Sequence, residues 1–265
     1  MKTGAEIRDV TFRGGGFTVV PKRGAALVAF VALIAFWELA CRAGWVSPIF
    51  LPSPANIVAA LHELLATGKL WLHISESLRR LAIGWSFGTV SGLGIGFAIG
   101  VWSLSRAVGL PLVSALFPIP KIALLPLLIL WLGIGEPSKV ATIALGVFFP
   151  TAIATFSAID SVPRNLIRMG QSFNLPAIDV LRKIVLPGAL PGILAGFRIT
   201  ASIGLILLVS AEMIGAEYGI GAFILQAGNL MQTDQLLAGV VMLSILGLLI
   251  GTGLTRLEAW LLRWR

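Results

Sequence analysis

Few residues in this chain could do covalent or metal chemistry. Residues 84–88 read Gly-Trp-Ser-Phe-Gly and match the Gly-x-Ser-x-Gly pattern of a nucleophilic serine. That pattern requires a strand-to-helix turn and Asp and His partners further along the chain. Both histidines, His62 and His73, precede it, and it lies within an apolar run. The single cysteine, Cys41, allows neither an internal disulfide nor a cysteine-based metal site. We therefore predict no catalytic residue and no metal centre.

The chain also lacks a nucleotide-binding loop of its own. The nearest fragment to Gly-x-x-x-x-Gly-Lys-Ser/Thr is Gly68-Lys69, which Leu70 follows. Lys121 is the one cation set among four prolines of a long apolar run, at positions 111, 118, 120 and 126. An ionisable residue at that depth suits a transport pathway. A lysine that reaches along its stem to the membrane interface suits the pattern equally well.

The elements that must position these residues are membrane helices. The 265 residues are 57% hydrophobic and only 12% charged, with a mean hydropathy of +0.94. A soluble domain is about a quarter charged, so a single soluble core is excluded. Several apolar runs reach the roughly 20 residues that cross a bilayer. We read the net charge of +8 as a sign of membrane topology and predict no nucleic-acid partner.

We predict an all-α polytopic membrane protein with about six transmembrane helices. A polar tail (1–23) comes first, and then the first span with an external segment (24–77). The core transmembrane domain (78–260) follows, and 261–265 close the chain. Four prolines keep the third span from forming one regular helix. A short interfacial helix at 57–65 follows the prolines of residues 51–54. The expected spans are 24–43, 78–102, 110–132, 140–159, 192–211 and 236–254.

The basic residues predict the orientation. If both termini are cytoplasmic, the tail cluster, Arg106, the basic residues of 161–191 and the C-terminal arginines gather on one side. The opposite topology would reverse this asymmetry. The polar segment 161–191 is then cytoplasmic, and 212–235 is external. In that external segment Glu212 and Glu217 are expected to meet a partner, to stabilise the mouth, or to be ordinary exposed loop charges.

The second span carries a row of glycines at every fourth residue. This spacing places them along one face of a helix, where small residues let another helix backbone approach closely. We therefore predict a helix-packing face made of Gly84, Gly88, Gly92, Gly96 and Gly100.

The polar segment 161–191 is patterned like a structure rather than a loose loop. Apolar residues recur at roughly helical spacing on both sides of Asn174, a residue that tolerates a left-handed turn. We predict a helix, a turn, a short docking helix at 175–181 that ends with Arg182 and Lys183, and a Pro-marked return to the membrane. A solvated loop with a surface helix fits the same pattern.

At this point the chain resembles the permease subunits of binding-protein-dependent ABC importers, of the nitrate, sulfonate and taurine branch. The resemblance covers nearly all of the chain beyond the tail. Its motifs are Ile-Val-Leu-Pro at 184–187, Pro-Gly-Ala-Leu-Pro-Gly-Ile-Leu-Ala-Gly-Phe-Arg at 187–198, Leu-Pro-Ser-Pro at 51–54, Ser-Leu-Arg-Arg at 77–80, Trp-Leu-Gly-Ile-Gly at 131–135, Ala-Glu-Met-Ile-Gly at 211–215 and Arg-Trp-Arg at 263–265.

The resemblance implies a type I ABC importer permease in the inner membrane of a bacterium. ATP and Mg would bind a partner ATPase, and no cofactor would bind this chain. The other partners would be a periplasmic or lipid-anchored binding protein, a second copy of the chain and membrane lipid. The implied ATPase-coupling residues are Arg168, Met169, Gly170, Asn174, Leu175, Ala177, Ile178, Asp179, Leu181, Arg182, Lys183, Leu186 and Pro187.

The chain departs from the family signature at two places. Arg168, Met169 and Gly170 stand where Glu-Ala-Ala is usual, and Asn174 replaces a glycine. Losing the glutamate removes an expected contact to the ATPase, which leaves the docking details open.

The substrate implied by the branch is a small anion such as a sulfonate, taurine or nitrate, with Lys121, Ser202 and Ser210 as candidate path residues. A neutral pyrimidine-type precursor remains an alternative substrate. A secondary carrier and a membrane scaffold without transport are the alternative functions.

Overall fold

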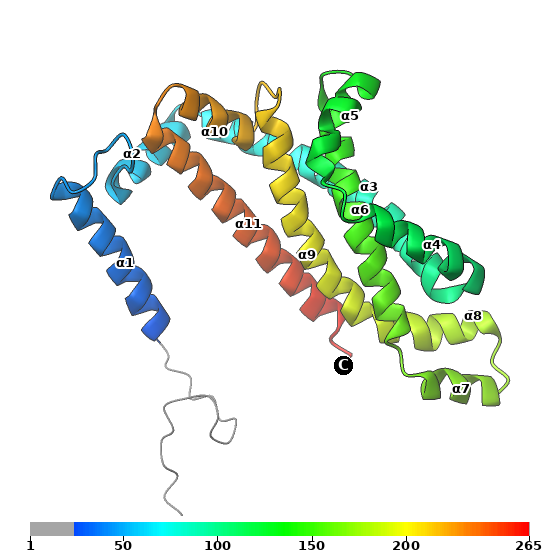
Figure 1. Ribbon diagram of the computed structural model, residues 1–265. Helices are drawn as coiled ribbons and strands as arrows, with labels where there is room; N and C mark the ends of the chain where they lie inside the picture. Colours follow the sequence, from blue (N-terminus) through cyan, green and yellow to red (C-terminus); the bar gives the residue numbers. More distant parts are fainter. Residues whose placement is uncertain (1–23, 265) are drawn as a thin grey trace, which may run out of the picture. The chain divides into compact units, whose positions relative to one another are not determined.

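The structure is a computed structural model that describes residues 24–264, and these residues form helices and turns without a β-strand among them (Figure 1). The predicted tail, 1–23, lies outside the described residues. Five of the helices are long and apolar enough to cross a membrane, and one bent helix pair adds a sixth crossing if it is counted as one span. The prediction of an all-α membrane protein with about six spans is confirmed. Backbone contacts divide the chain after Ala55 into two units, described here separately.

The first unit is built around α1 (Ala25–Arg42), which matches the predicted first span. None of its residues is buried. A helix that is mostly apolar and mostly exposed suits a lipid environment. The carboxylate of Glu38 accepts hydrogen bonds from Arg42 at 2.7 Å and from the amide of Ala55 at 3.1 Å, so the residues after the helix are tied back to it.

The second unit holds the remaining spans. Its helices are α2 (Pro54–Ala66, which begins at the division), α3 (Lys69–Val101), α4 (Ser103–Leu116), η1 (Lys121–Leu124), α5 (Leu125–Leu132), α6 (Glu136–Asp160), α7 (Arg164–Ser172), α8 (Ala177–Val180), η2 (Leu181–Val185), α9 (Leu186–Met213), α10 (Ile220–Asn229) and α11 (Thr233–Leu261).

The centre of this unit is the contact between α3 and α6, and α9 packs against α6 from another side (Figure 1). All five glycines of the predicted packing face lie against α6. A Cβ added at any of them would lie within 3.0 Å of an α6 atom, for example 2.7 Å from the carbonyl oxygen of Phe148 at Gly92. Backbone or side-chain atoms of α6 therefore occupy the space that a side chain at each of these positions would need.

The third predicted span is broken, as its prolines required. The segments Ser103–Leu116 and Lys121–Leu132 meet at 85°. The ammonium group of Lys121 lies at this break and donates to the carbonyl oxygens of Leu116 (2.8 Å), Phe117 (3.1 Å) and Ile119 (2.7 Å). It also lies over the ring of Phe149, 4.4 Å from the centroid. Lys121 thus satisfies carbonyls that the end of α4 leaves without helical partners.

Several predicted boundaries differ from the structure. Residues 69–77, expected outside the membrane helix, form the first turns of α3. Residues 103–106, expected as a turn, begin α4. The expected external segment 212–235 contains the helix α10, and Glu212 belongs to α9. At residues 69–77, 103–106 and 212, polar residues within a helix were interpreted as lying beyond its end, whereas α10 is a mostly apolar helix too short to be recognised as a span.

Candidate functional site

The first candidate site is the segment between α6 and α9, residues 161–185, which we call the arm. It extends beyond the end of the helix bundle in Figure 1. It contains α7, a turn, α8 and η2, in the order that the sequence predicted.

Two residues that depart from the family signature explain the shape of the arm. Asn174 has a φ of 53° and adopts the left-handed conformation, and the amide of Leu175 donates to the carbonyl of Gly170 at 3.2 Å. This is a way in which helices commonly end. Gly170 is buried, and a Cβ there would lie 2.7 Å from Cδ1 of Ile184. The glycine therefore lets α7 lie close to η2, while the asparagine turns the chain back.

The second half of the arm is continuous with a membrane span. α8, η2 and α9 form one helical segment from Ala177 to Met213, 37 residues long. η2 is a π-helical turn. Pro187 has no amide hydrogen to donate to the carbonyl of Lys183, four residues earlier, and a widened turn next to that gap is the expected accommodation. The predicted docking helix 175–181 is therefore wrong in its bounds: it begins at Ala177, and Arg182 and Lys183 do not end it.

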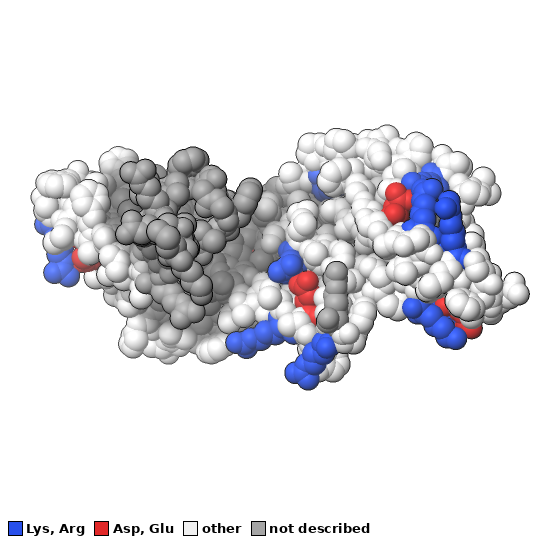
Figure 2. Space-filling model, turned by 90° about the horizontal axis from the view of Figure 1, so that it is seen from below, with Lys and Arg blue, Asp and Glu red and all other residues white. Residues whose placement is uncertain are grey.

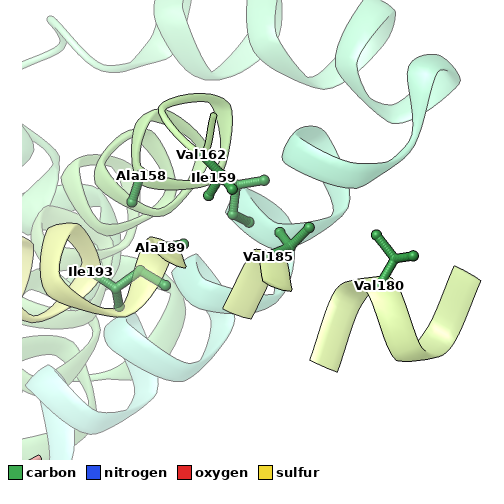
Figure 3. Close-up of a cluster of buried hydrophobic side chains, with 7 residues drawn as sticks. All are labelled: Ala158, Ile159, Val162, Val180, Val185, Ala189 and Ile193. Carbon is green, nitrogen blue, oxygen red and sulfur yellow. The ribbon is translucent and has the colours of Figure 1, made fainter. Parts of the chain in front are cut away.

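Buried apolar side chains fasten the arm to the bundle (Figure 3). Val180 of α8 and Val185 of η2 belong to one cluster with residues of α6 and α9, among them Ile159 and Ala189. In Figure 3 the side chain of Val185 lies next to Ile159 and Val162. The arm is therefore joined to α6 and α9 by close-packed side chains.

The outer side of the arm exposes large apolar residues. Leu166 is 40% exposed, Met169 51%, Phe173 74% and Ile178 52%. The first three follow one another at helical spacing along α7 and the residue that ends it, and the exposed Arg168 lies between them in the sequence. An exposed apolar patch with a charged rim indicates a protein interaction site.

The second candidate site is a buried charge network at the opposite end of the bundle. The guanidinium group of Arg80 donates from Nε and Nη2 to both carboxylate oxygens of Glu136 (2.7 and 2.8 Å), and from Nη1 to Glu212 (2.8 Å) and to the carbonyl of Tyr218 (2.6 Å). The Arg80 side chain is 4% exposed and that of Glu212 0%. The hydroxyl of Ser77 also donates to Glu212 at 2.7 Å.

This network closes on the short helix α10. The amide of Gly221 donates to Glu212 at 2.9 Å, and the amide of Ile220 donates to the hydroxyl of Ser77 at 2.8 Å. A Cβ at Gly219, where φ is 139°, would lie 2.5 Å from the Glu212 carboxyl carbon. Glu212 therefore joins α3, α9 and α10, and Arg80 adds α6. The expectation that Glu212 is an exposed loop charge is wrong.

The other predicted path residues lie in ordinary helical surroundings. The hydroxyl of Ser202 donates to the carbonyl of Arg198 at 3.2 Å, and that of Ser210 to Ile206 at 2.9 Å. Ser202 is exposed and Ser210 is half-buried. These hydrogen bonds do not join either serine to Lys121, so the role of the three residues in one path stays a prediction. Among the described residues no group of three His, Cys, Asp or Glu side chains could hold a metal ion.

The described residues thus form a bundle of membrane helices and an arm with exposed apolar residues beyond it. The family described as the binding-protein-dependent transport system inner membrane component matches residues 90–265, and the chain belongs to this family. It is the permease subunit of a binding-protein-dependent ABC importer of the inner membrane, and the corresponding prediction is confirmed.

Named relatives and solved structures agree with this assignment. The chain is 37% identical to the putative aliphatic sulfonates transport permease protein SsuC of Escherichia coli, over 88% of this chain and 89% of the relative. It is 34% identical to the taurine transport system permease protein TauC of the same organism, over 88% and 86%. The inward-facing MetNI methionine ABC transporter matches with a TM-score of 0.61 at 26% identity, over 70% of this chain and 93% of that one. An amino acid ABC transporter matches in fold, with a TM-score of 0.58.

Proposed function

We propose that this permease carries aliphatic sulfonates, with taurine among them. The observation that supports this substrate class is the pair of relatives named for sulfonates and taurine, each similar to this chain over 88% of its length. Nitrate and a neutral pyrimidine-type precursor are the competing substrates.

The arm is the part of the chain that we propose couples transport to ATP hydrolysis. The exposed apolar face formed by Leu166, Met169, Phe173 and Ile178 is suited to a groove on the ATPase. Tight packing of the arm on α6 and α9 would turn movement of the ATPase into movement of these spans as rigid bodies. ATP and Mg would stay on the ATPase.

Cysteine cross-linking tests this docking. In a Cys41→Ala background, Ile178→Cys is expected to cross-link to the co-purified ATPase, because Ile178 is 52% exposed on the outer face. Val185→Cys is the matched control, because Val185 is 5% exposed within the cluster and is expected to give no product. Equal products from both positions, or none from Ile178 in an intact complex, would reject this docking surface.

The distribution of basic residues supports a cytoplasmic arm. Figure 2 shows the end of the molecule that carries the arm, where separate groups of basic side chains lie on the surface. In the second unit, the described basic residues near this end include Arg106, Arg164, Arg168, Arg182, Lys183, Arg256 and Arg263; at the other end of the same unit Arg80 and Lys139 are buried, and Lys69 and Arg79 are exposed. By the positive-inside rule, the arm end faces the cytoplasm.

Two copies of the chain would form the path between them, with Lys121, Ser202 and Ser210 as candidate lining residues. Lys121 offers a positive charge for an anion, but its hydrogens are engaged by backbone carbonyls in this conformation. Lys121→Met tests its role. Loss of sulfonate uptake with the complex intact would support a place in the path, and unchanged uptake would remove it.

Reconstitution is the test of the whole proposal. The chain, its ATPase and its binding protein in proteoliposomes are expected to take up taurine and hexanesulfonate with ATP, and neither nitrate nor a neutral pyrimidine. Uptake by the chain without the ATPase would instead indicate a secondary carrier. ATP hydrolysis without any uptake would contradict a transport role.

A further inference from the structure

A cavity of about 440 Å³ lies between the arm and the bundle. Its walls come from the end of α3, the start of α4, the end of α6 and the inner sides of α7 and α8. A volume of this size lies within the range of small-molecule sites in proteins.

The cavity and the proposed docking face lie on different sides of α7. Arg164, Ile167 and Gln171 line the cavity. They follow the same helical spacing as the exposed Leu166, Met169 and Phe173, shifted by two residues, which is about 200° around a helix. A protein bound to the outer face would therefore leave the cavity open.

The walls combine an apolar interior with two arginines. Ile159, Val162 and Val180 are buried apolar residues of the lining. Arg106 is fixed in place, because its Nη1 donates to Asp160 at 2.8 Å and its guanidinium lies 4.9 Å from the centroid of the Phe156 ring.

Arg164 makes no ion pair with any of the described residues, although it lines the same cavity. With Arg106 already balanced by Asp160, the charge at the cavity is one positive in excess. A pocket that has both apolar and polar walls and one uncompensated cation complements a molecule that has a short apolar body and one negative head.

We propose that this cavity is a binding site for a small amphiphilic anion. Its head would lie against Arg164 and Gln171, and its apolar body against the buried valine and isoleucine side chains. The choice of a sulfonate as the probe rests on the proposed function, but the site itself does not. Such an anion could be imported cargo or an anionic lipid, and the experiment separates these two sources.

The test is calorimetric titration of hexanesulfonate into the purified full chain, in nanodiscs of neutral lipid at low ionic strength. One saturable site per chain is expected. Inorganic sulfate has the charge without the tail, and hexyltrimethylammonium has the tail with the opposite charge; both should bind at least about tenfold more weakly, since each lacks one of the two interactions. Equal affinities for hexanesulfonate, sulfate and hexyltrimethylammonium would overturn the proposal. A hexanesulfonate titration that does not saturate would also overturn it.

Variants locate the site. Arg164→Gln removes an exposed charge without a partner and should weaken hexanesulfonate binding by about tenfold. Gln171→Trp should block binding by filling the cavity. Arg256→Gln removes another unpaired, exposed arginine near the same end and should leave the affinity unchanged. Equal losses in Arg164→Gln and Arg256→Gln would show a general charge effect and refute the site.

Repeating the titration in nanodiscs that contain phosphatidylglycerol assigns the natural ligand. A lower affinity for hexanesulfonate there, restored by neutral lipid, indicates that lipid occupies the site, whereas an unchanged affinity indicates a soluble anion. Because binding is measured without transport, a failure of sulfonate uptake by the assembled importer leaves this result intact, and a failure of binding leaves the transport proposal intact.

Discussion

Replacing Arg80 by methionine tests whether the buried charge network holds the bundle together. The substitution keeps much of the side-chain volume but removes every hydrogen bond from the guanidinium group. Glu136 is 41% exposed, so water can replace its lost partner. Glu212 is 0% exposed and would keep only the hydroxyl of Ser77 and the amide of Gly221.

The expected cost follows from this difference in exposure. Removing one partner of a buried ion pair costs about 3–5 kcal/mol, because the remaining charge cannot reach water. Arg79→Met is the matched control on the same helix. Arg79 is 55% exposed and pairs with Glu76 at 3.0 Å and with Glu136 at 3.3 Å, so its loss should cost at most about 1 kcal/mol. Adding Glu212→Gln to Arg80→Met should recover part of the loss, since no buried charge then stays unpaired.

The assay is equilibrium unfolding of the purified chain in mixed micelles, followed by tryptophan fluorescence. The free energy of unfolding should fall steeply for Arg80→Met and little for Arg79→Met. If the two variants differ by less than about 0.5 kcal/mol, or if the double variant is the least stable, the network does not stabilise the fold in the way described.

The other predictions use the same unfolding assay or amide hydrogen exchange. Gly92→Ala should cost about 1–3 kcal/mol, because its Cβ would meet Phe148, whereas Gly94→Ala, with open space around it, should be neutral or stabilising; equal effects would contradict the packing face. Asn174→Ala should raise amide exchange in α7 by the equivalent of about 1 kcal/mol and Asn174→Gly should not, and an unchanged rate in Asn174→Ala would show that the left-handed turn is dispensable. Lys121→Met should cost about 1–3 kcal/mol by leaving carbonyls around the end of α4 unsatisfied, and an unchanged free energy of unfolding would show that the ammonium group does not stabilise this break.

The membrane spans could be predicted from the sequence, because a long apolar run is visible in composition alone. The ends of the helices could not be predicted where polar residues have partners far away in the chain. Arg80 lay at the outer end of the expected span 78–102 with no partner predicted for it, but its partners come from α6, α9 and the residues before α10. The glycine row predicted a packing face on α3, yet nothing in the row says that the partner is α6.

In the arm, too, a feature set by local sequence was predictable and a feature set by the wider structure was not. The left-handed turn at Asn174 was predictable, because asparagine carries a local preference for it. The continuity of α8 with α9 was not, because Pro187 and Pro191 were read as breaks. Pro187 leaves one carbonyl without an amide donor inside the continuous helix, and one widened turn is enough to accommodate this gap. Glu212 had no local signal beyond the nearby Gly219 and Gly221, whose need for close approach appears only once the network is known.

The uninterrupted helix from Ala177 to Met213 also fixes a rotational phase over about 55 Å. The face that α8 turns toward the bundle and the face that carries Glu212 are set by the number of residues between them. One alanine inserted near Ser202 would rotate one end by about 100° relative to the other, while each end kept its own sequence. We expect such a chain to bind its ATPase but to lose ATP-driven uptake. If α8 kept its packing on the bundle, Glu212 would turn away from Arg80 and α10, and if Glu212 kept these partners, α8 would turn away from the bundle.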